Sequence, residues 1–264
     1  MEKKRLEIMA PAGNFECLHA AIQGGADSVY FGVEKLNMRS HSANNFKSTD
    51  LAEIVRICSE HNVKTYLTLN IALFGEDLED MRKTLDAAKA AGITAVIASD
   101  MAAILYARQI GVEVHISTQL SISNVEALRF YAQFADVIVL ARELNLGQVK
   151  EIKRIIDEEQ ICGPSGNIVE IEMFAHGALC MAISGKCYLS LHEYGASANR
   201  GSCFQLCRRA YRVEDHETGM ELEIDNKYIM SPKDLCTIEF MDKIIDAPNS
   251  GVYVPSQTAS AARR

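Results

Sequence analysis

The first 177 residues repeat one unit, in which a short β-branched run is followed by a polar loop and an amphipathic helix. Seven strands are predicted, at Leu6–Ala10, Ser28–Val33, Lys64–Asn70, Ala95–Ser99, Glu113–Thr118, Val137–Ala141 and Ile168–Phe174. Helical periodicity lies between them and is clearest at Leu51–Glu60, Leu78–Ala91, Asn124–Phe134 and Leu146–Glu159. Strands that alternate with helices in this way are typical of a parallel sheet.

Seven units that approach eight favour a closed TIM-like (β/α)8 barrel over an open doubly wound sheet. The turn after the first strand reads Ala10-Pro11-Ala12-Gly13, and the absence of Gly-x-Gly-x-x-Gly there disfavours a dinucleotide-binding fold. A chain of 264 residues has a length that a single α/β barrel commonly has. Gly251–Val254 is the candidate for a short last strand.

The β-α rhythm breaks after the seventh strand, and this break defines the predicted organisation. Residues 178–232 are rich in Cys, Arg, Ser and Gly, and we interpret them as an insertion over the barrel mouth. An acidic stretch at Val213–Ile229 within them is expected to form a hairpin. Asp234–Ala247 resumes a helical pattern. The predicted parts are therefore 1–177 (barrel), 178–232 (insertion) and 233–264 (last helix and tail).

Charge and hydropathy restrict the functional classes. A formal net charge of -8 argues against binding of nucleic acid by the whole surface, although a local basic patch is compatible with it. No apolar run reaches the roughly 18 residues of a membrane span. The basic start lacks the apolar region of a signal peptide, because Glu7 and Pro11 interrupt it. The sequence predicts a cytoplasmic protein with no membrane contact.

Polar residues follow the predicted strands, where the active sites of (β/α)8 barrels lie. These residues are Asn70, Asp100, Thr118, Gln119, Arg142, Glu143 and His176. His115 and Glu172 lie inside strands, so the strand register decides whether they face the interior. For each single residue the alternative is an ordinary polar loop, and Asp100 is also suited to cap the next helix.

Five of the eight cysteines fall within 57 residues: Cys180, Cys187, Cys203, Cys207 and Cys236. Thiolates bind soft metals, and four that converge suit an iron–sulfur cluster or zinc. The Cys-x-x-Cys spacing of zinc ribbons is absent, which favours the cluster. Cys17, Cys58 and Cys162 are scattered, and we interpret them as small structural side chains.

A basic segment surrounds these cysteines. It contains Arg200, Arg208, Arg209 and Arg212, with Lys186 and Lys233 nearby and Phe204 and Tyr211 interleaved. Such a segment suits RNA phosphates and bases, a small dicarboxylate held by bidentate pairing, or the negative charge of a thiolate-ligated cluster. The spacing alone leaves all three open.

These segments resemble a known family. The run Glu172-Met173-Phe174-Ala175-His176-Gly177-Ala178-Leu179-Cys180, with Gly185-Lys186-Cys187-Tyr188, is similar to the signature of the collagenase-like peptidase family U32. Further matches are Ala10-Pro11-Ala12-Gly13-Asn14, Ala26-Asp27-Ser28-Val29-Tyr30-Phe31-Gly32, His115-Ile116-Ser117-Thr118-Gln119, Asn199-Arg200-Gly201-Ser202-Cys203 and Ser231-Pro232-Lys233-Asp234-Leu235-Cys236. The resemblance extends to about Ala247.

The resemblance implies an iron–sulfur enzyme that takes part in oxygen-independent hydroxylation of an RNA base, a tRNA wobble uridine or an rRNA base, with prephenate as a co-substrate. It implies that a four-iron–four-sulfur cluster is bound by Cys180, Cys187, Cys203 and Cys236, with Cys207 as the substitute for Cys203. We expect a pocket beside it, lined by Asn70, Gln119, Arg142, Glu172 and His176, in which His176 and Glu172 handle protons. The arginines Arg200, Arg208 and Arg209 are expected to hold the anionic co-substrate or phosphates.

Two other functions stay open. The family label implies a collagenase-like peptidase, and Cys180 lies four residues after His176, which suits a Cys–His pair if the segment is helical. His-Glu-x-x-His and Gly-x-Ser-x-Gly are both absent. The third function is that of a non-catalytic metal-binding subunit of a partner protein.

The sequence departs from the family pattern at its end. The family usually continues from the last helix into a strand that ends in a Lys-Ile-Glu-Gly-Arg-like motif. Here Asp246-Ala247 is followed by Pro248-Asn249-Ser250-Gly251-Val252-Tyr253. The last strand is therefore predicted to be altered or missing, and the small, polar segment 256–264 is expected to fray.

Overall fold

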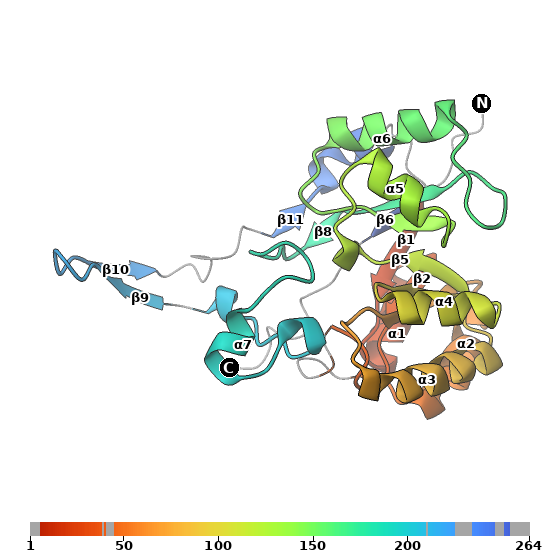
Figure 1. Cartoon of the computed structure of the whole chain (residues 1–264), viewed down its shortest axis with the longest axis horizontal. Coiled ribbons are helices and arrows are strands. Elements are labelled where there is room, and N and C mark those ends of the chain that lie inside the picture. Colours follow the sequence, from red (N-terminus) through yellow and green to blue (C-terminus); the bar gives the residue numbers. More distant parts are fainter. Residues whose placement is uncertain are drawn as a thin grey trace.

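The computed structural model describes residues 6–38, 40, 45–209, 211–224, 234–245 and 251–253. Lys233 of the basic segment and the tail at 256–264 lie outside the described residues. Figure 1 shows a barrel with helices around it and an extension that leaves the barrel on one side.

Seven parallel strands curl around a common core, as the β-α rhythm predicts. They are β1 (Glu7–Pro11), β2 (Ser28–Phe31), β3 (Lys64–Leu69), β4 (Ala95–Ala98), β5 (Glu113–Ile116), β6 (Val137–Val139) and β7 (Glu170–Phe174). Each of them pairs in parallel with the next along the chain. Every predicted strand is present, with bounds that shift by a few residues.

The eighth strand, β12 (Gly251–Tyr253), closes the barrel between β7 and β1. It pairs in parallel with both neighbours, since Gly251 lies opposite Glu7 on one side and Glu172 on the other. The last strand is therefore short but not missing, and it occupies the range that the sequence suggests. The TIM-like barrel is confirmed.

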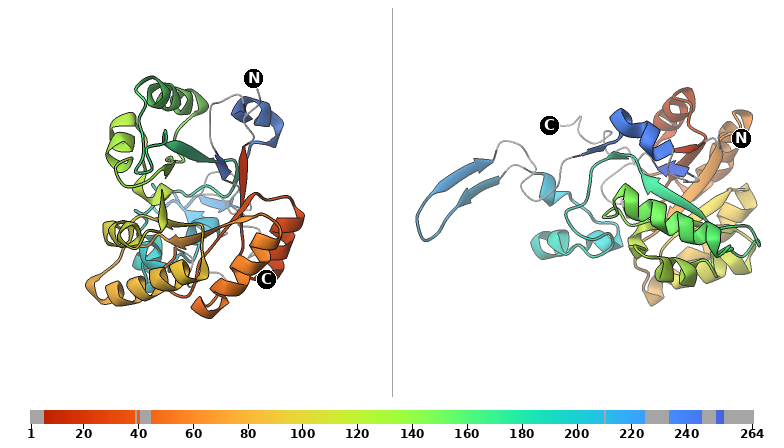
Figure 2. Two further views of the ribbon diagram at one scale, coloured as in Figure 1. Left: turned by 90° about the vertical axis from the view of Figure 1, so that its right-hand side faces the viewer. Right: turned by 90° about the horizontal axis from the view of Figure 1, so that it is seen from above.

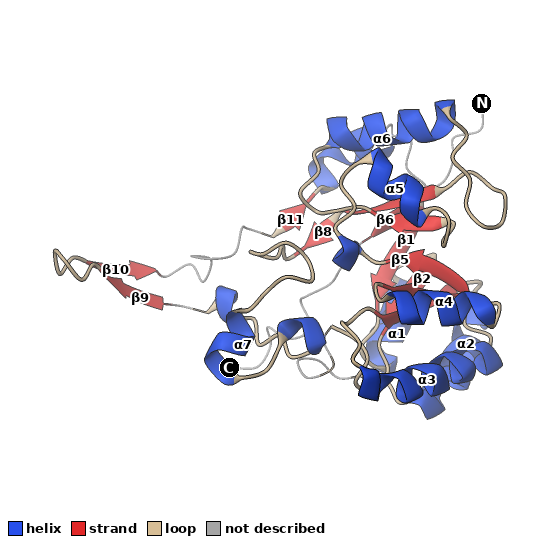
Figure 3. Ribbon diagram, viewed as in Figure 1, coloured by secondary structure: helices blue, strands red, loops and turns tan. Residues whose placement is uncertain are grey.

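Six helices cover the outside of the barrel, and Figure 3 shows them in blue around the red strands. They are α1 (Phe15–Gln23), α2 (Leu51–Glu60), α3 (Leu78–Ala91), α4 (Met101–Gln109), α5 (Val125–Tyr131) and α6 (Leu146–Glu158). Their buried faces and the outward faces of the strands form one large apolar core. Local signals set the helix ends: Gly92 ends α3 in the left-handed conformation at φ 81°, and Asn145 with Gln148 forms a capping box at α6.

The barrel interior is unusually polar. The third residues of β1, β3, β5 and β7 are Met9, Tyr66, His115 and Glu172, and all four are buried. Alternate strands of such a barrel contribute the side chains of one interior layer. Strand register thus places His115 and Glu172 inside the barrel.

The chain after β7 forms small elements outside the barrel. They are β8 (His176–Gly177), α7 (Leu189–Tyr194), β9 (Tyr211–Glu214), β10 (Glu221–Ile224), β11 (Leu235–Cys236) and α8 (Met241–Ile245). The β9–β10 hairpin confirms the predicted hairpin, and the right-hand view of Figure 2 shows the extension beside the barrel. The helical prediction for Asp234–Ala247 is wrong at its start, because Leu235–Cys236 pairs with β8 instead. The division of the chain at residues 177 and 232 stays a prediction.

Among the described residues, none of the helices combines the length and the apolar character that crossing a membrane requires.

Candidate functional site at the barrel mouth

A pocket of about 190 Å³ lies at the carboxyl ends of β3, β4 and β5. The barrel lines it with Met38, Asn70, Ile71, Ala72, Ser99, Asp100, Gln119 and Leu120, and the cysteine-rich segment adds Gly185 and Asn199. This volume is below the usual range for drug-sized ligands, so the pocket suits a small planar or compact group. Residues that the sequence places at the carboxyl ends of the strands, among them Asn70 and Gln119, therefore line one pocket.

Two predicted site residues, Asn70 and Gln119, line this pocket together. The Oδ1 atom of Asn70 accepts a hydrogen bond from the Met38 amide (3.2 Å), which leaves the side-chain NH2 group as a donor. The Oε1 atom of Gln119 is buried and has no hydrogen-bond partner within the described part of the chain. A buried acceptor of this kind is costly unless a ligand or water pairs with it.

Asp100 also lines the pocket, but its oxygens are already used. Oδ1 accepts from the Ala102 amide (2.9 Å) and caps α4, and Oδ2 accepts from the Leu73 amide (3.1 Å). The alternative interpretation of Asp100 as a helix cap is confirmed.

Glycines let the cysteine-rich segment lie directly on the barrel mouth. At Gly201 (φ 90°) a Cβ atom would meet Ser40 Oγ at 2.1 Å and the Asn37 carbonyl at 2.7 Å. At Gly185 (φ 73°) it would meet the Gln119 carbonyl at 3.0 Å. Only glycine permits this backbone conformation and approach without strain. The cysteine-rich segment is therefore built to cover the pocket.

Asn199 connects the pocket to the cysteines, and sequence reasoning did not select it. Its carbonyl accepts from the Ala72 amide (3.0 Å), and its Oδ1 accepts from the Cys187 amide (3.3 Å). One residue thus touches the barrel loop after β3, lines the pocket and positions the backbone of Cys187. The only sequence feature that pointed to Asn199 as a site residue was its place in the run Asn199-Arg200-Gly201, which belongs to the family resemblance.

Arg200 fastens the same segment to the barrel. Its guanidinium donates to Asp77 and to the Ala72 carbonyl (3.0 Å), and it lies 3.9 Å from the centre of the Phe74 ring. The hydrogen bond from Arg200 lowers the pKa of Asp77 more than the partial burial of that carboxyl raises it. Arg200 thus connects the insertion to the barrel, and Asp77 neutralises its charge. We refer to the contacts of Arg200 with Asp77, Ala72 and Phe74 as the clasp.

An Asp77→Asn variant is expected to loosen this clasp, because the partly buried ion pair is lost while the side chain keeps its shape. The expected loss of stability is about 1 kcal/mol. The cysteine-rich segment should also be cut faster by trypsin, as measured by limited proteolysis and mass spectrometry. Glu76→Gln is the matched control, because Glu76 is 78% exposed and 3.9 Å from Arg200. Equal cleavage of both variants would contradict the clasp.

Four cysteine thiols form a group in the insertion. The pKa of Cys207 is raised to about 11, first by its burial and then by the nearby charges of Cys180, Cys203 and Cys187. Cys236 lies on β11 opposite His176, and it is exposed, as Cys180 is. This arrangement favours Cys207 beside Cys203, whereas the prediction from the family resemblance uses Cys236.

The donor set fits a thiolate-bound metal centre, although no three Cys, His, Asp or Glu side chains in the described residues surround a single ion position. The three scattered cysteines stay apart from this group. Cys58 is fully buried, its pKa is raised to about 11 by that burial, and Cys162 is exposed at the outer end of α6.

The other predicted site residues do not meet in the pocket. His176 is exposed on β8, and Glu172 is buried inside the barrel. Arg142 follows β6, and its guanidinium lies 4.3 Å from the centre of the Phe174 ring. The structure therefore separates the proton-handling pair that the sequence predicts, and it gives Glu172 a different partner.

That partner is His115. Its Nδ1 lies 3.3 Å from Glu172 Oε1, and its Nε2 lies 3.3 Å from Glu113 Oε1. Burial acts to lower the pKa of His115, but the hydrogen bond with Glu113 and the charges of Glu113 and Glu172 outweigh burial and raise the pKa to about 9. The imidazole is thus held in its charged form at neutral pH.

Tyr66 extends this buried network toward the amino ends of the strands. Its ring centre lies 4.6 Å from that of His115, and its hydroxyl donates to Glu7 Oε1 (2.6 Å). Lys64 donates to the other oxygen of Glu7 at 2.6 Å. Burial acts to raise the pKa of Glu7, but the hydrogen bonds from Lys64 and Tyr66 outweigh burial and lower this pKa. The network joins the barrel interior to the surface opposite the mouth.

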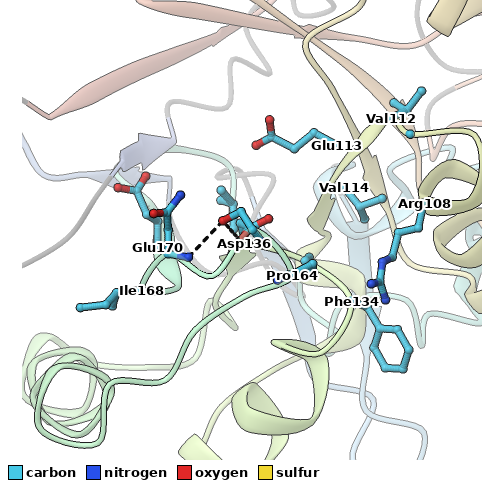
Figure 4. Close-up of a pocket in the computed structure, with 14 residues that line it drawn as sticks. Arg108, Val112, Glu113, Val114, Phe134, Asp136, Pro164, Ile168 and Glu170 are labelled. Atoms are coloured by element: carbon cyan, nitrogen blue, oxygen red, sulfur yellow. Dashed lines mark hydrogen bonds between the residues drawn. The ribbon is translucent and has the colours of Figure 1, made fainter.

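A second hollow, of about 820 Å³, lies at the amino ends of β5, β6 and β7 (Figure 4). Its polar groups have structural partners. Asp136 Oδ1 accepts from Ser165 Oγ (2.6 Å), and Arg108 donates to the Gln133 carbonyl (2.8 Å) beside the Phe134 ring. These contacts hold the barrel elements together, whereas the chemistry of (β/α)8 barrels takes place at the opposite face. The mouth pocket is therefore the candidate site.

These features define a class of protein, a (β/α)8 barrel whose mouth is covered by a cysteine-rich segment. The chain belongs to Peptidase family U32, whose family model matches residues 13–262. The solved structure of the U32 peptidase Mk0906 has the same fold, with a TM-score of 0.60 at 13% identity over 97% of this chain and 94% of that one.

Two relatives carry different functional names. A protein named collagenase from Porphyromonas gingivalis (strain ATCC BAA-308 / W83) is 62% identical over 94% of this chain and 60% of its own length. The tRNA hydroxylation protein P1 of Bacillus subtilis (strain 168) is 38% identical over 92% of this chain and 56% of its own length. The chain thus spans little more than half the length of these relatives.

Proposed function

We propose that this chain is the barrel part of an iron–sulfur protein that takes part in oxygen-independent hydroxylation of an RNA base, in tRNA or rRNA. The observation that carries the proposal is the thiol group Cys180, Cys187, Cys203 and Cys207, joined to the mouth pocket through Asn199. A thiolate cluster one residue away from a small polar pocket is an arrangement that brings redox-active iron to a bound substrate. The name of the tRNA hydroxylation relative agrees with this function.

The thiol group supports a four-iron–four-sulfur cluster over a single zinc ion. Cys180, Cys187 and Cys203 belong to both ligand sets, and Cys207 or Cys236 completes the set. The Cys-x-x-Cys pairs of zinc ribbons are absent from the sequence, which favours the cluster. When bound, the cluster would supply a Lewis-acidic iron that also changes its oxidation state.

The mouth pocket suits a single base. Asn70, Gln119 and Asn199 present amide groups, which both donate and accept hydrogen bonds and so match the edge of a nucleobase. A pocket of about 190 Å³ is too small for a folded chain segment but has room for one flipped ring. Prephenate, proposed as the co-substrate, is a dicarboxylate and would require cationic partners, for which Arg142 is the candidate nearest the barrel interior.

A peptidase is the second candidate, because the 62% identical relative is named collagenase. The helical Cys–His pair that this function was expected to use is not formed, since His176 lies in strand β8 and Cys180 lies in the loop after it. No hydrogen bond joins these two residues in the described structure. The described structure therefore disfavours a peptidase built on His176 and Cys180.

Anaerobic purification with iron and sulfide analysis tests the proposal. We expect near-equal amounts of iron and sulfide with broad visible absorption, both lost in a Cys203→Ala variant. Cys17→Ala is the matched control, because Cys17 lies on α1, away from the thiol group. A colourless protein that takes up no iron during anaerobic reconstitution would overturn the cluster and favour zinc or a peptidase. Iron binding without RNA modification, even with a partner protein present, would favour the metal-binding subunit.

A further inference from the structure

Large apolar side chains are exposed in the cysteine-rich segment. Tyr188, Leu191 and Tyr194 are 69%, 39% and 51% exposed, and they follow one another at three-residue spacing from the N-cap of α7 to its last residue. Phe204 is 39% exposed, and its ring centre lies 5.1 Å from that of Tyr194 at an angle of 64°. The Phe204 amide donates to Ser190 Oγ (3.2 Å), which fixes this ring beside α7. Aromatic surface of this kind usually marks a contact with another molecule.

One arginine beside these rings keeps an unpaired charge. Arg200, Arg208 and Arg212 form ion pairs with Asp77, Asp234 and Glu221. Arg209 instead donates to the Tyr194 hydroxyl (2.6 Å), lies 5.4 Å from the centre of the Tyr194 ring and contacts no carboxylate among the described residues. The chain has a net charge of -8, so an exposed cation without a carboxylate partner is a possible contact for an anionic ligand.

We propose that Tyr188, Tyr194 and Phe204, with Arg209, form a stacking platform for a single-stranded stretch of RNA. This proposal rests on the proposed function and assigns the nucleotides that flank the modified base to α7. Exposed rings stack on bases of any sequence, and a guanidinium beside them contacts phosphate and stacks as well. The exposed Arg209 cation, which complements the negative charge of phosphates, favours RNA over a protein partner.

The location of the platform agrees with this role. Phe204 lies between Cys203 and Cys207 in the sequence, so the platform and the thiol group share one loop. Figure 1 shows α7 on the side of the barrel from which the insertion emerges. RNA stacked there lies beside the mouth, where the target base would enter the pocket. The platform therefore gives affinity, and the amide pocket selects the base.

Binding of a fluorescein-labelled oligouridine, measured by fluorescence anisotropy, tests the platform. Tyr188→Ala, Tyr194→Ala and Phe204→Ala are each expected to weaken binding about 5-fold or more. Arg209→Gln should weaken binding and lower its salt dependence. Tyr194→Phe keeps the ring and should retain most of the affinity. Phe130→Ala is the matched control, because Phe130 is 52% exposed on α5 at the outside of the barrel.

The platform is overturned if the wild-type chain does not bind oligouridine, or if the platform variants bind it as tightly as the wild-type chain does. Tighter binding of duplex RNA than of single-stranded RNA would overturn it as well. Loss of RNA modification in variants that bind RNA normally would also overturn it and point to a protein partner. The proposed function is judged separately, by the modified base in RNA from cells that contain the wild-type chain. Failure of the platform thus leaves that result unchanged.

Discussion

A Cys187→Ala variant is expected to leave RNA unmodified while the barrel stays folded. Cys187 belongs to the four-thiol group, and its amide is held by Asn199 Oδ1 at 3.3 Å. Alanine preserves that backbone contact and removes only the sulfur. Loss of groups that merely support a metal ligand costs about 10- to 100-fold in activity, so loss of a ligand should cost about 100-fold or more.

The measurement is the amount of hydroxylated base in RNA from a deletion strain that carries each variant, determined by liquid chromatography and mass spectrometry. Cys162→Ala should restore wild-type levels, because Cys162 is exposed and away from the thiol group. A peptidase that needs no cluster would keep its proteolytic activity in Cys187→Ala. Wild-type RNA modification by that variant would refute the role of the thiol group.

The same assay decides the fourth ligand. The charges of Cys180, Cys187 and Cys203 act on Cys207, whereas Cys236 lies on β11, outside the segment that carries Cys203 and Cys207. We therefore expect Cys207→Ala to be as damaging as Cys187→Ala. Cys236→Ala should retain more activity, and the reverse order would favour the ligand set that the family resemblance implies.

The helices that sequence patterns predicted best are those with strong local signals. The structure reproduces Leu51–Glu60 and Leu78–Ala91 without change, because periodic apolar faces and a Gly92 cap are encoded within a few residues. Asn70 and Gln119 were found by a topological rule, since the carboxyl ends of parallel strands meet at one face. Local pattern and topology together were sufficient for the barrel and part of the pocket.

Long-range pairing was not predictable in this way. The partner of Glu172 is His115 because β5 and β7 contribute to one interior layer, and strand register is fixed only when the barrel closes. Likewise, Arg200 suits phosphate as well as carboxylate, and only the docked insertion shows that Asp77 neutralises it. The charge of a side chain predicts what kind of group it can bind, but only the tertiary structure shows which group it binds.

Glu172→Ala is expected to destabilise the barrel strongly. The imidazole of His115 is 3% exposed and would stay charged with one of its two carboxylate partners missing. Removing one partner of a buried ion pair costs about 3–5 kcal/mol. Urea unfolding followed by circular dichroism measures the loss. Glu113→Gln is the control on the other side of the imidazole, because Glu113 is 48% exposed and water compensates for its loss.

The pH dependence of stability has a defined sign. His115 has a pKa raised from 6.5 to about 9 in the folded chain, so the folded state binds its proton more tightly than the unfolded state does. This contribution is complete below pH 6.5 and is lost as the pH rises through about 9. In Glu172→Ala the decline over this range should be smaller, because one of the two carboxylates that raise the pKa is gone.

A double variant, His115→Phe with Glu172→Leu, separates the electrostatic cost from the role of Glu172. Both charges leave together, and phenylalanine keeps the ring contact with Tyr66 at 4.6 Å. Apolar residues of similar volume often replace a buried ion pair at little cost, so most of the stability should return, without the decline between pH 6.5 and about 9. If the double variant is as unstable as Glu172→Ala, packing rather than charge explains the loss. If it is stable but leaves RNA unmodified, the His115–Glu172 pair takes part in the reaction, whereas full modification restricts the pair to supporting the barrel interior.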